Sequence, residues 1–169
     1  MSLHPTFPLR LEQGAAQLIL MPCPGTKEAD LTSSLTQLKK SGVNVVITLM
    51  TSTELNELSL DISHITGLLG MDWFHLPIED DCVPDADFSE SWKTVGPIIH
   101  ALLNKGEHVA IHCKGGSGRT GLVSGQILIE RGEKLSLVIE KVTKLRSNAF
   151  KLKKHVDYIK AVENNAKYN

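Results

Sequence analysis

The sequence predicts one α/β domain in which a mostly parallel sheet is flanked by helices in three layers. Strand-like and helix-like segments alternate along the chain, which is typical of parallel strands joined by helical crossovers. The chain has 169 residues, enough for one substantial core but few for two independent domains. Its composition, 41% hydrophobic and 22% charged, is that of an ordinary globular protein. We therefore expect residues 1–169 to form a single domain.

Four segments predict strands because they are rich in β-branched or aromatic residues and are bounded by turn signals. They are residues 17–21, 43–49, 73–76 and 108–112. Ligands bind at the carboxyl ends of the strands in open α/β sheets. A binding site is therefore expected where the last of these strands ends.

A helix is predicted between the first two strands, over residues 28–41. Leu31, Leu35 and Leu38 fall on one face of it. Acidic residues stand at its start and lysines at its end, which complements the helix dipole. Gly42 follows as a C-cap, so both ends of this helix are marked in the sequence.

Helices are also predicted in the second half of the chain from the spacing of apolar residues. One runs over residues 87–104, and Pro97 inside it should cause a kink or an interruption. An apolar helix is expected over residues 121–129, after the last strand. Two more, over residues 136–146 and 151–164, complete a helical C-terminal half.

A glycine-rich loop connects the last predicted strand to the apolar helix. Its residues are Cys113, Lys114, Gly115, Gly116, Ser117, Gly118 and Arg119. Glycines can take positive φ and carry no Cβ, so successive N–H groups can curl around an anion. The N-terminus of the following helix favours an anion through its unpaired N–H groups and its dipole. The loop is therefore predicted to bind a phosphate group.

A thiol and a guanidinium stand at the two ends of this loop. Arg119 can donate two parallel hydrogen bonds to phosphate oxygens, which a lysine could not do with the same geometry. A helix N-terminus and a nearby arginine both favour the thiolate form of a cysteine, and the thiolate is the nucleophile. We therefore expect Cys113 to be available as a thiolate near neutral pH.

The segment from His112 through Cys113, five further residues, Arg119 and Thr120 resembles the signature of the cysteine-dependent protein tyrosine and dual-specificity phosphatases. Residues 77–85 resemble the general-acid loop of the kinase-associated phosphatase type, in which the acid is the aspartate three residues after the proline, here Asp80. The Trp-Pro-Asp loop of receptor and cytosolic tyrosine phosphatases is absent from the sequence. The resemblance implies the single-domain, three-layer phosphatase fold and a dual-specificity type of activity.

The resemblance also implies a mechanism with a phosphocysteine intermediate. Cys113 would attack phosphorus while the loop amides and Arg119 stabilise the equatorial oxygens. Asp80 would protonate the leaving oxygen and then activate the water that hydrolyses the intermediate. Thr120 would assist departure of the thiolate, and His112 would order the loop by hydrogen bonding. No metal or other cofactor is implied, and the remaining histidines form no spaced metal-binding cluster.

Other interpretations of the loop compete with this one. The three glycines at 116, 118 and 121 fit the dinucleotide fingerprint, but no second strand ending in an acidic residue follows. A nucleotide triphosphatase loop would need a Gly-Lys-Ser/Thr sequence, which is missing. A glycine-rich turn with a buried, inert cysteine is the remaining alternative.

The sequence leaves alternatives for the acid and for the substrate. Asp81 competes with Asp80 as the general acid. Lys114 could attract an anionic substrate, but Ser117 stands where phosphoinositide phosphatases of this superfamily often have a second basic loop residue, which favours a phosphoprotein. A phosphatase of a small phosphorylated metabolite or phospholipid, and a phosphate-binding module without turnover, are the other candidate functions.

Charge and hydropathy indicate few other partners. A net charge of −1 with interspersed signs does not favour nucleic-acid binding. The longest apolar stretch before the loop, residues 18–21, is too short to span a bilayer, so no membrane association and a cytoplasmic location are expected. Oligomeric state is not predicted. The basic C-terminal segment is interpreted as a solvated surface rather than as a docking patch; its residues are Lys141, Lys144, Arg146, Lys151, Lys153 and Lys154.

The three cysteines suit a reducing compartment rather than a disulfide framework. Cys23 or Cys82 could act as a resolving thiol if Cys113 is oxidised to a sulfenic acid. The alternative is that both are unpaired structural cysteines.

Overall fold

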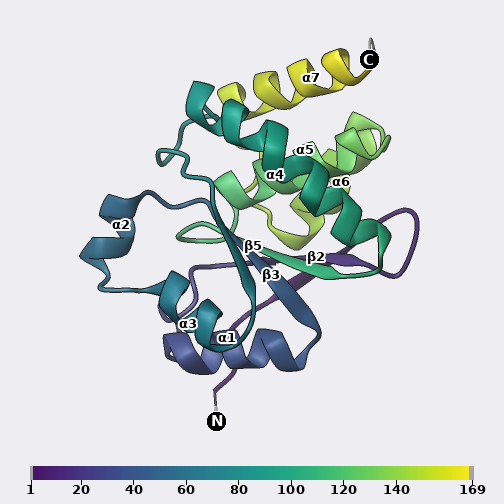
Figure 1. Ribbon diagram of the computed structural model, residues 1–169. Helices are drawn as coiled ribbons and strands as arrows, with labels where there is room; N and C mark the ends of the chain where they lie inside the picture. Colours follow the sequence, from purple (N-terminus) through teal and green to yellow (C-terminus); the bar gives the residue numbers. More distant parts are fainter. Residues whose placement is uncertain (1, 168–169) are drawn as a thin grey trace.

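A five-stranded sheet lies at the centre of the molecule and helices cover both of its faces (Figure 1). The structure is a computed structural model and describes residues 2–167. The order across the sheet is β1-β2-β5-β3-β4; β1 is antiparallel to β2, and the other neighbours are parallel. The predicted α/β class with a mostly parallel sheet is therefore confirmed. The strands are β1 (Phe7–Arg10), β2 (Gln17–Met21), β3 (Val43–Thr48), β4 (Asp72–His75) and β5 (His108–His112).

The helices form two layers, one on each side of the sheet (Figure 1). Three short helices cover one face, and four helices cover the other. The first group is α1 (Leu31–Lys40), α2 (Ser52–Glu57) and α3 (Ile62–Leu68). The second group is α4 (Ala86–Asn104), α5 (Gly118–Glu130), α6 (Leu135–Leu145) and α7 (Lys153–Lys167).

Alternation of side chains along the inner strands divides the core into two parts. On β2, Leu18 and Leu20 enter the core beneath the α4–α7 layer, while Ile19 and Met21 enter the core beneath the α1–α3 layer. Successive residues of a strand point to opposite faces of a sheet, so apolar residues at every position indicate a strand covered on both sides. The near-continuous apolar composition of this strand is thus explained by its central position.

Helix α5 is the most deeply buried helix of the α4–α7 layer. Two of its glycines allow close packing: a Cβ at Gly121 would lie 2.7 Å from the Cβ of Ala149, and a Cβ at Gly125 would lie 3.0 Å from Phe150 Cζ. Such distances leave no room for a side chain. The close approach fixes the start of α5, and with it the glycine-rich loop, against the segment that follows α6.

The observed boundaries agree well with several predicted elements. The strands predicted over residues 17–21 and 108–112 have those bounds in the structure. The predicted helix over residues 28–41 begins later, at Leu31, because the Asp30 side chain accepts a hydrogen bond from the Ser33 N–H over 2.7 Å and caps the helix there.

The expectation at Pro97 was a kink or an interruption; α4 runs through that residue as one helix, so the interruption is wrong, while the kink stays a prediction. Trp92 and Ile99, on either side of Pro97, are both buried in the core. Proline removes one intrahelical hydrogen bond, and the packing of the flanking residues outweighs that loss. The elements β1, α2 and α3 were not predicted from the sequence.

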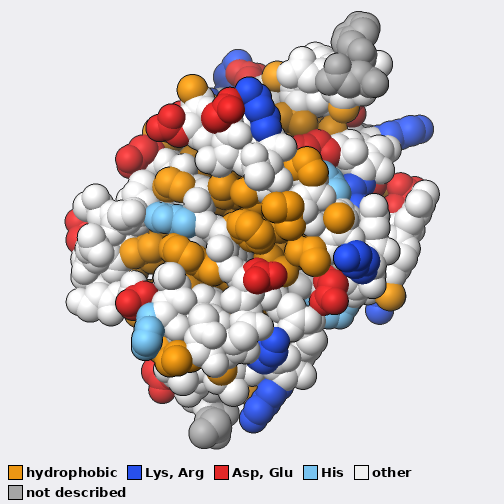
Figure 2. Space-filling view, viewed as in Figure 1, with side chains coloured by type: hydrophobic (Ala, Val, Ile, Leu, Met, Phe, Trp, Pro, Cys, Tyr) orange, Lys and Arg blue, Asp and Glu red, His pale blue; other side chains and the backbone are white. Residues whose placement is uncertain are grey.

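Hydrophobic side chains gather near the middle of the face seen in Figure 2, between α4 and the side of α1 and α3. Charged side chains surround this area. Within residues 2–167, no helix combines the length and the apolarity that crossing a membrane would require.

Alanine substitutions at two helical glycines should have opposite effects on stability. Gly67→Ala in α3 places a methyl group in open space and should raise the free energy of unfolding by about 0.5–1 kcal/mol, because alanine favours a helix. Gly121→Ala in α5 should lower it by about 1–3 kcal/mol, because the new Cβ overlaps Ala149. Urea denaturation of both variants measures the two changes, and a Gly121→Ala protein as stable as the wild type would contradict the packing described for α5.

Candidate active site

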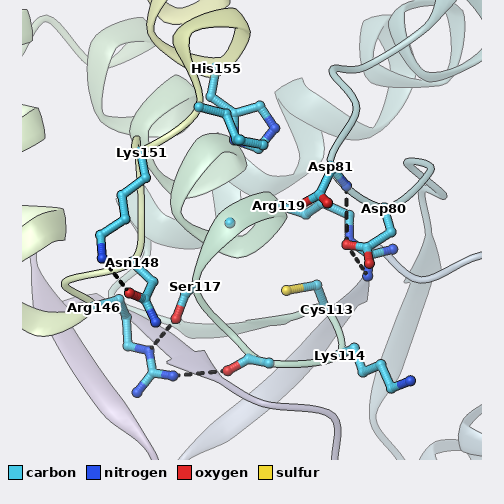
Figure 3. A pocket seen from close by; sticks show the side chains of 13 residues that line it. Asp80, Asp81, Cys113, Lys114, Ser117, Arg119, Arg146, Asn148, Lys151 and His155 are labelled. Carbon is cyan, nitrogen blue, oxygen red and sulfur yellow. Dashed lines mark hydrogen bonds and ion pairs between the residues drawn. The ribbon is translucent and has the colours of Figure 1, made fainter.

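The glycine-rich loop lies where β5 ends and α5 begins. It lines a cavity of about 560 Å³ together with Asp80 and Asp81 on one side and residues 146–155 on the other (Figure 3). The carboxyl ends of β4 and β5 and the start of α7 therefore meet at one site. This is the position at which an open α/β sheet binds its ligands.

Every carbonyl group of residues 113–117 accepts a hydrogen bond from a donor outside this segment. In the order of the carbonyls, the donors are His112 Nδ1, the Cys23 N–H, Arg146 Nη2, Arg146 Nε and the Gly121 N–H, at 3.0, 3.0, 2.9, 3.0 and 2.7 Å. The C=O and the following N–H of a trans peptide point in opposite directions. Fixing the carbonyls on the outside of the loop therefore turns the amides toward its inside.

One of the inward amides contacts the sulfur of Cys113. The Gly116 N–H donates to Cys113 Sγ over 3.3 Å. Five further loop amides donate to no group within residues 2–167, and they belong to Lys114, Gly115, Ser117, Gly118 and Arg119. With the N-terminus of α5 behind them, these N–H groups can bind the oxygens of a phosphate.

Only one of the three loop glycines takes the positive φ that glycine permits. Gly116 has a φ of +76°, and a Cβ there would lie 2.4 Å from the backbone of Met21 and Pro22. Gly115 and Gly118 do not have positive φ, and a Cβ at Gly115 would have no neighbour within 4 Å. Of the three glycines that can take positive φ, only Gly116 uses this freedom, because a single left-handed residue is enough to turn this loop.

Arg119 is buried and held by two different segments. Its Nη1 and Nη2 donate to the two carboxylate oxygens of Glu54 over 2.8 and 2.9 Å, and Nη1 also donates to the Ile78 carbonyl over 2.9 Å. Burial works against the charge of Arg119, but the hydrogen bonds to Glu54 and nearby negative charges raise its pKa. A planar guanidinium fixed in this way is oriented before any ligand arrives.

Glu54 is a site residue that the sequence analysis missed. It belongs to α2, where Thr51 and Glu54 form a reciprocal capping box that fixes the start of this short helix. Burial alone would raise the pKa of Glu54, but the hydrogen bonds from Arg119 and Thr51 lower it overall. The Thr-x-x-Glu pattern was visible in the sequence, whereas its contact with Arg119 depends on the fold.

Arg146 is the second site residue that the sequence analysis misjudged. It was interpreted as part of a solvated basic surface, but its guanidinium donates to the carbonyls of Gly115 and Gly116 and to Ser117 Oγ. The guanidinium also lies 4.1 Å from the centre of the Phe7 ring, on β1. Its hydrogen bonds and its stacking both hold the outer side of the loop.

His112 contacts the start of the loop, and the direction of its hydrogen bonds can be assigned. Its Nδ1 must donate to Cys113 O, because a carbonyl only accepts, and its Nε2 then accepts from Thr48 Oγ1 over 2.7 Å. Trp73 Nε1 donates in turn to Thr48 Oγ1 over 2.8 Å. Complete burial lowers the pKa of His112 to about 4, so the ring is neutral. The donor and acceptor in each hydrogen bond from Trp73 through Thr48 and His112 to Cys113 O are therefore fixed.

The segment after β4 brings Asp80 close to the loop. Asp80 Oδ1 lies 3.3 Å from Arg119 Nη2 and accepts the Asp81 N–H over 3.1 Å. Asp81 has a φ of 58°, which is rare for a residue other than glycine. His155 of α7 is buried and donates from Nε2 to the Cys82 carbonyl over 2.8 Å, so α7 holds this turn in place.

The remaining candidate residues are less well placed for their expected roles. Thr120 Oγ1 is buried and has no hydrogen-bond partner within residues 2–167, so the expected contact with the sulfur is not present. Lys114 extends away from Cys113 in Figure 3. Cys23 and Cys82 are free thiols, and burial raises the pKa of Cys23 to about 12. Whether either resolves an oxidised Cys113 stays a prediction.

No cluster within residues 2–167 brings together three or more His, Cys, Asp or Glu side chains in a way that could hold a metal ion. The site is instead built from backbone amides, one guanidinium and one thiol. These are the groups that bind a phosphate dianion and attack its phosphorus.

Residues 21–133 match the model of a protein family described as Tc-R-P, polymorphic toxin system, DSP-PTPase phosphatase. The chain belongs to this family. It is a cysteine-based phosphatase of the protein tyrosine and dual-specificity class, as the resemblance in the sequence implied. A comparison with curated proteins finds no match.

Solved structures share the fold of this phosphatase at low sequence identity. A kinase-associated phosphatase with its catalytic cysteine replaced by serine is 20% identical, with a TM-score of 0.84 over 99% of this chain and 98% of that chain. PTPMT1 in complex with PI(5)P is 20% identical, with a TM-score of 0.71 over 89% and 92%. A human tyrosine phosphatase-like serine/threonine/tyrosine-interacting protein is 20% identical, with a TM-score of 0.67 over 89% and 92%.

Alanine substitutions at the two adjacent glycines, Gly115 and Gly116, should have different effects on vanadate binding, because only Gly116 shapes the loop. Gly116→Ala forces a Cβ onto the backbone of Met21 and Pro22 at a left-handed position, so vanadate binding should weaken by tenfold or more. Gly115→Ala meets no neighbour and should bind vanadate within about threefold of the wild type. Equal losses in the two variants would contradict the loop geometry.

The buried neutral His112 should make stability depend on acid pH. Its pKa is 6.5 in a model peptide and about 4 in the folded protein, so the unfolded chain takes up the proton first. The contribution is fully present above pH 6.5 and is lost as the pH falls toward 4, by about 3 kcal/mol in total. Denaturation at pH 7 and pH 4 measures this loss together with that of His4, whose pKa is also lowered by burial, so nitrogen NMR of the folded protein isolates His112: a His112 ring protonated at pH 6 would contradict the assignment.

Proposed function

We propose that this phosphatase hydrolyses phosphomonoesters through a phosphocysteine formed on Cys113, with Arg119 as the phosphate-binding cation and Asp80 as the general acid. The observation that carries the proposal is the arrangement around Cys113 Sγ. Five carbonyls are fixed outward, the Gly116 amide donates to the sulfur, and Arg119 is held by Glu54 and the Ile78 carbonyl.

In the first step, the Cys113 thiolate attacks phosphorus opposite the ester oxygen. The P–S bond forms while the P–O bond to the leaving group breaks, and the proton of Asp80 passes to the departing oxygen. The loop amides and Arg119 stabilise negative charge on the three equatorial oxygens, which is the main source of catalysis in phosphoryl transfer. These donors do not have to reorient during the step, because the hydrogen bonds described above already fix their positions.

In the second step, water attacks phosphorus and the P–S bond breaks. Asp80, now a carboxylate, accepts the proton of the water, and phosphate leaves as Cys113 returns to a thiolate. We assign Thr120 to stabilising the departing thiolate. Its buried hydroxyl has no competing partner within residues 2–167, so it is free to reorient toward the sulfur.

Geometry supports Asp80 rather than Asp81 as the acid. The Asp80 carboxylate lies beside Arg119, the residue that will hold the phosphate, and is held there by the Asp81 N–H. The bond between His155 and the Cys82 carbonyl ties the turn to α7. Asp81 contributes its backbone to that turn.

We infer that the substrates are phosphorylated proteins, with phosphotyrosine as the main residue and phosphoserine or phosphothreonine as further ones. A small phosphoester or a phospholipid headgroup is the alternative. A catalytic thiolate has to be kept reduced, which supports a cytoplasmic site of action. The complete set of Cys113, Arg119, Thr120 and Asp80 argues against a binding module without turnover.

Hydrolysis of p-nitrophenyl phosphate in the presence of a metal chelator tests the reaction. The wild type should turn over, and Cys113→Ser should be inactive, because serine is not ionised at neutral pH, while still binding phosphate. Trapping of a phosphoenzyme on the wild type by rapid quench, absent from Cys113→Ser, identifies the intermediate. Full activity of Cys113→Ser would sink the mechanism.

Asparagine at the two neighbouring aspartates tests the choice of acid. Asp80→Asn should lower kcat by about 10²- to 10⁴-fold on a phosphotyrosine peptide, because the leaving oxygen then departs unprotonated. The loss should be much smaller on p-nitrophenyl phosphate, whose leaving group is weakly basic. Asp81→Asn is the matched control and should keep most of its activity on both substrates; the reverse pattern would assign the acid to Asp81.

A further inference from the structure

The cavity above the loop has two walls of different charge. Asp80 and Asp81 form one wall, and Lys151 and Asn148 lie on the opposite side, with the Cys113 sulfur between and below them (Figure 3). The acidic wall is explained by the general acid. Nothing in the proposed chemistry at phosphorus requires the basic wall.

Lys151 and Asn148 contact each other and still have hydrogen-bond donors available for a ligand. Lys151 Nζ donates to Asn148 Oδ1 over 2.8 Å. An ammonium group has three N–H bonds, so at least one more donor is available, and the Asn148 amide N–H2 group is not used by this contact. Lys151 is exposed, and both residues line the cavity.

The other cations near the cavity are already committed or point elsewhere. Arg146 uses its guanidinium on the carbonyls of Gly115 and Gly116 and on Ser117 Oγ. Lys114 extends away from the sulfur in Figure 3. Among the described residues that line the cavity, Lys151 is therefore the cation placed to meet a group on the substrate other than the transferred phosphate.

The proposed function fixes how a substrate must lie between the two walls. Its phosphate sits on the loop, and its leaving oxygen faces Asp80. A second negative group beside Asp80 and Asp81 would be repelled, whereas one on the side of Lys151 would be attracted. The described cavity lining also contains no Phe, Tyr or Trp, so it offers charge and hydrogen bonds to the leaving group more than ring stacking.

We propose that Lys151 and Asn148 form a subsite for a second anionic group, so that this enzyme prefers phosphomonoesters whose leaving group carries a further phosphate or carboxylate. The inference rests on the proposed function, since it takes the position of the transferred phosphate from it. The second anion can come from an acidic or phosphorylated neighbour in a phosphopeptide or from a small molecule with two anionic groups. The chemistry recognised is the same in both cases.

The test compares kcat/KM within two matched pairs of substrates. The first pair is two phosphotyrosine peptides, one with Asp and one with Asn on both sides of the phosphotyrosine. The second pair is carboxyphenyl phosphate and phenyl phosphate. The proteins are the wild type, Lys151→Gln and, as a control with the same change of charge, Lys160→Gln. Lys160 is exposed on α7 and is not part of the cavity lining.

Lys151→Gln should lose about three- to fivefold in kcat/KM on the anionic member of at least one pair, which is the effect expected of one partly exposed ion pair. The neutral members should be unaffected, and Lys160→Gln should match the wild type on all substrates. The pair that responds identifies the source of the anion. Dissociation constants of the same ligands on Cys113→Ser, with and without Lys151→Gln, should show the same difference in binding.

An unchanged preference in Lys151→Gln, or an equal change in Lys160→Gln, would overturn the subsite while leaving the phosphatase mechanism intact. The two failures are distinguishable because p-nitrophenyl phosphate carries no second anion and reports on the reaction alone. A wild type without turnover of that compound would overturn the proposed mechanism, and the subsite with it.

Discussion

The site depends on one constraint: the carbonyls of residues 113–117 must be held outward so that the amides can point inward. An unpaired backbone carbonyl is costly where it is buried, and donors from other segments pair even the carbonyls of the exposed residues Lys114 and Gly115. The donors come from β5, from the end of β2, from the end of α6 and from within α5. The loop is thus held by several separate parts of the fold at once, and its amides form an anion site together with the single guanidinium of Arg119.

Arg119 meets a second constraint, because a buried guanidinium needs a counter-charge. Glu54 provides this counter-charge and accepts two parallel hydrogen bonds from Arg119, and the Ile78 carbonyl accepts a third. Removing a buried pair from water costs roughly what the pair returns, so its main effect is on geometry rather than on stability. Glu54 of α2 and the Ile78 carbonyl, just before Asp80, both contact the Arg119 side chain, so Arg119 fixes the positions of both segments. The cation, the acid and the loop consequently keep a fixed relation to one another.

The sequence predicted the parts of this fold whose signals are local. The strands at 17–21 and 108–112 were correct to the residue because each is a short apolar run between clear turn signals. The edge strand β1 was missed, since a segment of Phe, Pro, Leu and Arg has no alternation and becomes a strand only by pairing with β2. The helix α2 was missed because it has six residues and no apolar face, although the Thr-x-x-Glu pattern of its capping box is present in the sequence. Which of the three loop glycines takes the left-handed conformation could not be predicted, because composition alone does not distinguish Gly116 from Gly115 and Gly118.

Arg146 and Lys151 illustrate why a basic segment cannot be interpreted from its charge. They are five positions apart, and the sequence pattern assigns them to one solvated surface. In the fold, Arg146 donates to two loop carbonyls and to Ser117 Oγ and is thereby held against the loop, while the ammonium of Lys151 has one contact and lines the cavity. The first residue is therefore tied to the chemistry common to every substrate, and the second can vary with the leaving group. A change at Lys151 can alter which phosphoester is preferred without moving the loop, whereas a change at Arg146 frees two carbonyls and disturbs the amides that bind the phosphate itself.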